Sequence, residues 1–280
     1  MKSFFVLFAS VFVLSGCANI FDTNAFEAVD QPPKLVLADL PKDSGAVSDK
    51  LASDPGFIDS LAQDATALAA VQTTLQSGMA STDAAVKLQA AKDFIYVTTN
   101  ATSTLSVVNN AVGPLLGLAS GGASSLASGA DQGKAVQSLV KGFFADLSPA
   151  ALLSTLDSMA TIGNAFSVLD ASSAGSSSKF FSGSDSGTTA QVGVVSATMS
   201  ALMASTGKDL TTADGRKDAA TAVAALLASS DPNTFLAGGS FPSVGTQMGF
   251  LSDAVAGTAP APGTTNPYSY VTTLMGVLPI

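Results

Sequence analysis

The stretch VQSLVKGFFADL, residues 136–147, carries the clearest helical signal in the chain. Its apolar residues recur three or four positions apart, which places them on one stripe of an α-helix: Val136, Leu139, Val140, Phe143, Phe144 and Leu147. A half-buried strand would instead show alternation of apolar and polar residues. The stretch therefore predicts an amphipathic helix that buries one face.

Comparable apolar spacing predicts helices on both sides of this stretch: Phe57 to Gly78, Asp83 to Val112, Pro149 to Leu169, Val192 to Leu202, Ala220 to Leu227, Val244 to Val255 and Val271 to Leu278. Residues 95–108 are rich in Thr and Val and would also suit a strand. Turn signals appear only after them, at 109–110 and 113–114, which favours a helix. We therefore predict an all-α fold, as a multi-helix bundle or an irregular helical array, with two helical subdomains as an open variant.

Several predicted helices begin with a capping residue followed by proline. Such a pair satisfies a free backbone N–H and presets the first helical dihedral angle. The pairs are Asp54-Pro55, Ser148-Pro149, Asp231-Pro232 and Asn266-Pro267. Their spacing is irregular, so they indicate ordinary helix starts and not a solenoid repeat.

Two segments interrupt the helices. Residues 113–130 are small and apolar, and either a packed helix or a hinge fits them. Residues 171–190 are dominated by Ser, Gly and Thr, which predicts a loop between helical subdomains at 46–170 and 191–280. Within this loop, Phe180 and Phe181 are candidate contacts for a partner or a lipid surface. The alternative is that the pair folds back and pins the loop to the core.

The N-terminus carries the strongest functional signal. One lysine, Lys2, precedes the apolar run from Phe4 to Leu14, which is too short to span a bilayer but has the length of a signal-peptide core. The run ends in Leu14-Ser15-Gly16-Cys17. This sequence resembles the lipobox of bacterial lipoproteins, in which a branched apolar residue and two small residues precede a cysteine.

The resemblance covers 17 residues and implies a maturation pathway. Residues 1–16 would be the signal peptide, and Cys17 would become the lipidated N-terminus. Two or more acyl chains give stable membrane anchoring, whereas one gives only marginal binding. Ala18, in place of the Asp that retains lipoproteins at the inner membrane, implies the outer membrane; the side that the protein faces stays open. Residues 17–45 contain Pro32-Pro33 and several other helix breakers, and they predict a lipidated tether.

Composition excludes some partners. The whole chain has a formal net charge of −9, and loss of Lys2 with the signal peptide makes the mature chain one unit more negative. An acidic surface gains nothing from counterion release, so we expect no nucleic-acid partner. The same charge argues against electrostatic adhesion to anionic lipid, which leaves the lipid on Cys17 as the expected membrane contact. With no second cysteine, stability must come from apolar burial.

The chain lacks the residues of the common catalytic sites. It has no histidine, and its one cysteine is assigned to the lipid, so nucleophile activation by His and the common zinc sites are excluded. No phosphate-binding glycine loop or calcium loop is present. Asp214 and Asp218 lie one helical turn apart, but capping and solvation explain them better than a shared cation. We expect no enzyme, no cofactor and no metal.

The sequence leads us to expect a structural or partner-binding role in the cell envelope, with an envelope protein as the candidate partner. The alternative is a carrier that holds an apolar small molecule between its helices. The phenylalanines and four methionines would then be candidate lining residues: Met159, Met199, Met203 and Met248. Methionine at helical spacing is more often plain core, which ranks the carrier lower. An enzyme that uses paired Asp residues ranks last, because the chain has no Trp and no evident sheet.

Overall fold

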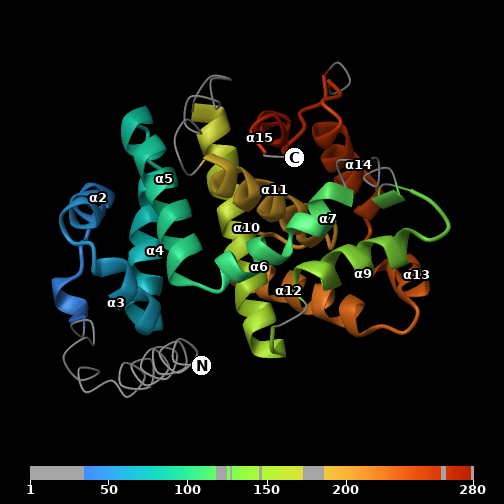
Figure 1. Ribbon diagram of the computed structural model, residues 1–280, viewed down its shortest axis with the longest axis horizontal. Coiled ribbons are helices and arrows are strands. Elements are labelled where there is room, and N and C mark those ends of the chain that lie inside the picture. Colours follow the sequence, from blue (N-terminus) through green and yellow to red (C-terminus); the bar gives the residue numbers. More distant parts are fainter. Residues whose placement is uncertain are drawn as a thin grey trace, which may run out of the picture. The chain divides into compact units, whose positions relative to one another are not determined.

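The helical spacing of the sequence is realised throughout the part of the chain that can be described. The computed structural model describes residues 35–117, 125–126, 128–144, 147–172, 186–259 and 263–278. These residues form helices joined by turns and loops, and they include no β-strand. The predicted all-α class is therefore confirmed, as a helical array (Figure 1). Cys17 and the Phe180-Phe181 pair lie outside the described residues.

The elements are short and numerous. In chain order they are η1 (Leu37–Asp39), α2 (Ser44–Ser53), α3 (Phe57–Gln63), α4 (Ala65–Met79), α5 (Ala84–Ala101), α6 (Thr104–Asn110), α7 (Val112–Gly117), α9 (Gln132–Phe143), α10 (Pro149–Ser172), α11 (Ser186–Ala204), α12 (Ala213–Ala228), α13 (Pro232–Phe235), η4 (Leu236–Ser240), α14 (Val244–Val255) and α15 (Tyr270–Met275). None of the described helices combines the length and the apolar character that crossing a bilayer requires.

Aspartate caps begin several helices, as the sequence predicts. The carboxylate of Asp83 accepts hydrogen bonds from two N–H groups in the first turn of α5, at 2.8 and 3.2 Å. The carboxylate of Asp231 accepts from Thr234 in α13, where Pro232 takes the first helical position. Such a cap satisfies N–H groups that have no partner within the helix.

Two predicted helices are interrupted, which corrects the expected boundaries. The run from Phe57 to Gly78 divides at Asp64, whose extended backbone and capping carboxylate end α3 and start α4. The run from Asp83 to Val112 is broken twice: it divides at Thr102 into α5 and α6, and then α6 ends before Ala111 and α7 begins at Val112. The Thr102 hydroxyl donates to the Thr98 carbonyl at 2.6 Å and accepts from the Thr104 N–H at 3.2 Å. At Asp64 and at Thr102 a side chain competes with the helix for backbone groups.

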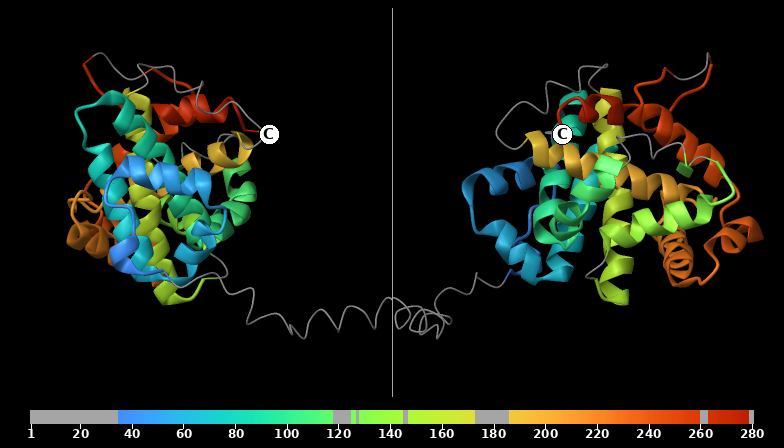
Figure 2. Two further views of the ribbon diagram at one scale, coloured as in Figure 1. Left: turned by 90° about the vertical axis from the view of Figure 1, so that its left-hand side faces the viewer. Right: turned by 45° about the vertical axis from the view of Figure 1, so that its right-hand side comes forward.

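Helix α11 lies at the centre of the array. Every residue from 192 to 203 is buried, so this helix is apolar or small on all sides. It packs against α6, α10, α12, α14 and α15. Its buried hydroxyls are mostly satisfied within the helix: Ser196 donates to the Val192 carbonyl and Thr198 to the Val194 carbonyl. Helix α10 lies beside it and also packs against α5 and α12 (Figures 1 and 2).

The stretch that opened the sequence argument forms α9 and the turn after it. Val136, Val140, Phe143 and Phe144 are buried, as the stripe predicts. The other face of α9 meets the second half of the chain, where the Gln137 amide donates to the carbonyls of Leu226 and Ser229, both at 2.8 Å, and closes the end of α12. Figure 2 shows α9 beside α12.

Helices from the two predicted subdomains share one core. Residues 35–280 form one compact unit, in which α10 packs against α11 and α12, and α9 against α13. The expected boundary loop stays a prediction, because residues 173–185 lie outside the described part. Within 113–130, α7 runs to Gly117 and packs against α9 and α11, which favours packed helix over hinge for its start. The segment expected as a tether already contributes to the body at its end, since Leu40 is buried.

Candidate functional site

The four methionines that the carrier alternative offered as pocket lining belong to the core, which is the more common place for methionine at helical spacing. Met159, Met199 and Met203 are fully buried, and Met248 is nearly so. None of these four lines either of the two hollows described below.

The best-formed hollow lies along α10, has a volume of about 450 Å³, and is called the α10 groove below. Its floor is the α10 face from Ala160 to Val168, and one wall is the end of α4, at Gln76 and Met79. The remaining lining comes from α11, from the segment that leads into α12, and from the C-terminal residues from Pro267 to Tyr270. The volume falls within the range of pockets that hold small molecules.

Arg216, from the first turns of α12, is the only charged residue among the described residues that line the groove, and it is the only arginine in the chain. Its Nε donates to the Asp157 carboxylate at 2.7 Å. Its Nη1 donates to the carbonyls of Leu210 at 3.2 Å and Thr211 at 3.4 Å. The Arg216 side chain is 14% exposed and that of Asp157 is 45% exposed. Three contacts therefore fix a largely buried guanidinium in one orientation.

Ser200 contributes a buried hydroxyl without a partner. It lies on α11 and lines the groove, and no described group forms a hydrogen bond with its Oγ. A serine in a helix commonly donates to the carbonyl four residues earlier, as Ser196 does. Ser200 instead points its hydroxyl at Gly163 of α10, where a β-carbon would overlap it. The two helices can approach closely here because position 163 carries no side chain.

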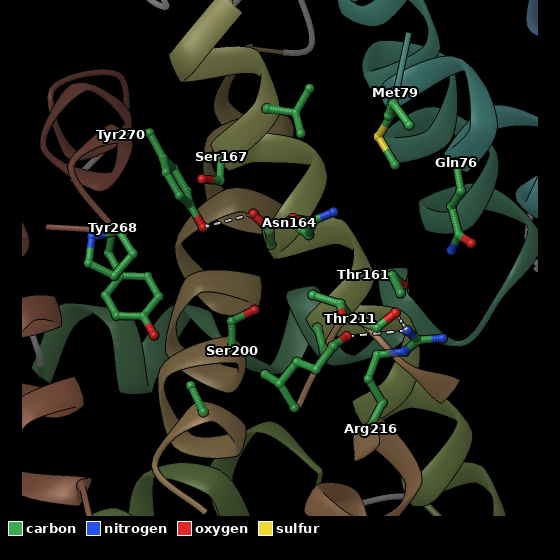
Figure 3. A pocket seen from close by; sticks show the side chains of 17 residues that line it. Gln76, Met79, Thr161, Asn164, Ser167, Ser200, Thr211, Arg216, Tyr268 and Tyr270 are labelled. Atoms are coloured by element: carbon green, nitrogen blue, oxygen red, sulfur yellow. Dashed lines mark hydrogen bonds between the residues drawn. The ribbon is translucent and has the colours of Figure 1, made fainter. Parts of the chain in front are cut away.

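Two tyrosines close the other end of the groove. Burial raises the pKa of both Tyr268 and Tyr270 well above the ordinary value, so both phenols stay neutral. The Tyr268 hydroxyl donates to the Gln247 amide oxygen at 2.8 Å, and the Tyr270 ring stacks on Phe166 with centroids 5.7 Å apart. Figure 3 shows the tyrosines on one side of Asn164 and Arg216 on the other.

The groove thus combines apolar walls with hydrogen-bonding groups. Ser167 and Asn164 of α10 and Gln76 of α4 add a hydroxyl and two amides to its lining (Figure 3). Among the described lining residues there is no carboxylate. Such a surface can orient a ligand through its polar groups and bury the ligand's apolar part. The titratable groups among its described lining residues are Arg216 and the two tyrosines, whose pKa values burial raises.

A second hollow, of about 660 Å³, lies around Tyr96 of α5 and is called the Tyr96 hollow. Tyr96 is 54% exposed and Leu105 of α6 is 37% exposed. Leu169 and Val192 lie beneath them. The hydroxyl of Thr99, buried in the same wall, has no hydrogen-bond partner among the described residues.

Asp93 of α5 is the one carboxylate that the described structure buries, and it lies outside the groove. It accepts hydrogen bonds from the Ser48 hydroxyl of α2 and, at 2.9 Å, from the Gln89 amide. Burial raises the pKa of Asp93 above its ordinary value, and the two hydrogen bonds oppose that rise. Its partners are a hydroxyl and an amide, so the site does not resemble a catalytic carboxylate pair.

The acidic pair considered for a cation is placed at the start of α12. Asp218 lies 3.8 Å from the Lys208 ammonium, and Asp214 falls in the first turn, where a negative charge complements the helix dipole. Among the described residues, no cluster of three or more acidic, His or Cys side chains has the arrangement of a metal site.

The comparison with known proteins gives no relative. No protein-family model, no curated protein and no solved structure matches the chain.

Proposed function

We propose that this chain is a lipid-anchored, non-catalytic binding protein of the cell envelope whose α10 groove holds a small molecule with a largely apolar surface. The anchoring part rests on the sequence from Leu14 to Cys17, and Ala18 favours the outer membrane. It predicts that Cys17→Ala removes the protein from the detergent phase in a phase-partition experiment. The native lipoprotein should stay in that phase.

The observation that carries the binding role is the polarity of the α10 groove. Arg216 places a fixed guanidinium at its rim, and Asn164, Ser167 and Gln76 add two amides and a hydroxyl to the lining. Such groups orient a ligand through hydrogen bonds. The apolar residues between these groups, among them Met79 and Val168, supply the remaining contact.

Native mass spectrometry of the lipoprotein, extracted from its own membrane in mild detergent, tests this proposal. We expect a bound mass of a few hundred daltons on the wild-type chain. Asn164→Trp should displace it, because Asn164 lines the groove. Ser154→Trp is the matched control, since Ser154 is exposed on the same helix and does not line the groove. A wild-type chain without any bound mass would contradict the carrier role.

The second candidate function is a structural or partner-binding role, and the Tyr96 hollow favours it. Exposed apolar residues that gather at one place commonly mark interaction sites. Tyr96 and Leu105 supply such residues. Under this candidate, Tyr96→Asp removes an envelope protein from the complex that copurifies with the lipoprotein. Ala85→Asp, a change at an exposed position on the same helix α5, leaves that complex intact.

A further inference from the structure

The α10 groove has a charge pattern that departs from the rest of the chain. The chain carries 21 acidic and 12 basic residues, yet Arg216 is the one charged side chain in the described lining of the groove. The neighbouring phenols of Tyr268 and Tyr270 are neutral, because burial raises the pKa of each. A ligand in the groove therefore faces one positive group and no negative lining group.

The guanidinium of Arg216 has bonding capacity left after its structural contacts. Nε and Nη1 are engaged by Asp157 and by two backbone carbonyls. No described residue accepts a hydrogen bond from Nη2. The rest of the guanidinium is fixed and only 14% of the side chain is exposed, so binding costs little further ordering. Figure 3 shows Arg216 below Gln76, on the α4 side of the groove.

We propose that the α10 groove recognises a carboxylate, as the single anionic group of a small apolar molecule, through Nη2 of Arg216. This inference rests on the proposed carrier function and names the ligand class of the same site. Asp157 already offsets one unit of charge, so the site suits a monoanion better than a phosphate dianion. The apolar body of the ligand lies over Met79, Ala160 and Val168.

Two probes of equal length separate the carboxylate from the apolar body: octanoate and octanamide. The full-length lipoprotein, in lipid nanodiscs and with methyl-labelled methionine, is titrated with each, and free ligand is measured in the same sample. Met79 lines the groove and reports occupancy, whereas Met159 and Met199 are buried core references. Octanoate should bind roughly tenfold more tightly than octanamide, because a charged acceptor strengthens the hydrogen bond.

Variants of the ion pair assign the preference to Arg216. Arg216→Gln should abolish the difference between the probes, with the core methionine signals unchanged as the control for folding. Asp157→Asn keeps the arginine and removes its counter-charge, so octanoate should bind about threefold more tightly and octanamide unchanged. This second variant tests the inference even if Arg216→Gln unfolds the chain.

The outcomes separate the two proposals. Equal binding of both probes at Met79 overturns the carboxylate inference and leaves the carrier role standing. Failure of both probes to shift Met79 while native mass spectrometry shows a bound molecule also overturns the carboxylate inference. Failure of both probes together with an empty wild-type chain overturns the carrier role itself.

Discussion

The hydroxyl of Ser200 occupies the space into which a β-carbon at position 163 would project. This contact joins α10 to α11, the two helices at the centre of the array, and it also forms part of the α10 groove. The missing side chain at Gly163 lets the helices approach closely, and the price is a buried hydroxyl without a partner. The packing of the two helices and the lining of the groove therefore depend on the same pair of residues.

Gly163→Ala should destabilise the protein, because the added methyl group overlaps Ser200 within a packed core. Overpacking of this kind costs about 1–3 kcal/mol in the free energy of unfolding, measured by urea denaturation. Gly249→Ala is the control: nothing lies within 4 Å of its β-carbon, and helix propensity favours alanine by up to about 1 kcal/mol. Adding Ser200→Ala to Gly163→Ala should recover part of the loss, and strictly additive effects would contradict the contact.

Ser200→Ala alone should stabilise the empty protein by about 1 kcal/mol, since it removes an unpaired buried hydroxyl. Ser196→Ala on the same helix should be destabilising, because the Ser196 hydroxyl donates to the Val192 carbonyl at 2.7 Å. Thermal unfolding of the two variants side by side checks the pair. A loss of stability in Ser200→Ala that matches the loss in Ser196→Ala would show that the Ser200 hydroxyl has a partner.

The contribution of Asp93 to the free energy of unfolding should change with pH in the opposite direction to the contributions of the exposed aspartates. Burial raises the pKa of Asp93, so the stability it contributes is full below the unfolded value near 3.8 and is lost as pH rises through the folded pKa. Hydrogen bonds lower the pKa of the exposed Asp209 and Asp231, whose contributions are instead lost as pH falls. The free energy of unfolding of Asp93→Asn should therefore rise relative to that of the wild type between pH 4 and pH 7, and denaturation of both proteins at these two pH values measures it. A constant difference between the two proteins would refute this account.

The Gln137 side chain should stabilise the contact between α9 and α12. Its amide donates to the carbonyls of Leu226 and Ser229, and the Leu226 carbonyl also accepts from the Ser229 N–H at the end of α12. Gln137→Ala removes both amide contacts and takes away the donor that the Ser229 carbonyl receives from α9, which should cost about 1 kcal/mol in the free energy of unfolding. Ser138→Ala, at an exposed position next in sequence, should change stability by less than about 0.5 kcal/mol. Similar losses in both variants would show that the amide contacts contribute nothing.

The fold class could be predicted because its signals are local. The apolar stripe of α9 and the caps at Asp83 and Asp231 depend on residues within one or two helical turns. The breaks at Asp64 and Thr102 could not be predicted, because the local pattern around each residue also fits a continuous helix. A polar residue within an apolar run has the same sequence pattern whether it is solvated on a continuous helix or caps the next one.

The groove could not be predicted, because distant segments assemble it. Gln76, Gly163, Ser200, Arg216 and Tyr270 meet only after α4, α10, α11, α12 and the C-terminal segment pack together. One signal was present in the sequence: Arg216 is the only arginine among the basic residues. The role of Arg216 depends on its contact with Asp157, and the spacing of the two residues in the sequence does not predict that contact. The burial of the core methionines, in contrast, could be predicted from their helical spacing alone.

Photocrosslinking in intact cells tests the central claim most directly, with a photoreactive residue placed in turn at Asn164 of the α10 groove and at Tyr96 of the second hollow. The carrier account predicts that position 164 captures a small molecule, seen as a defined mass added to its peptide, and that no protein is captured there. A protein captured at position 96, with no small adduct at position 164, would contradict it and identify the chain as a partner-binding protein.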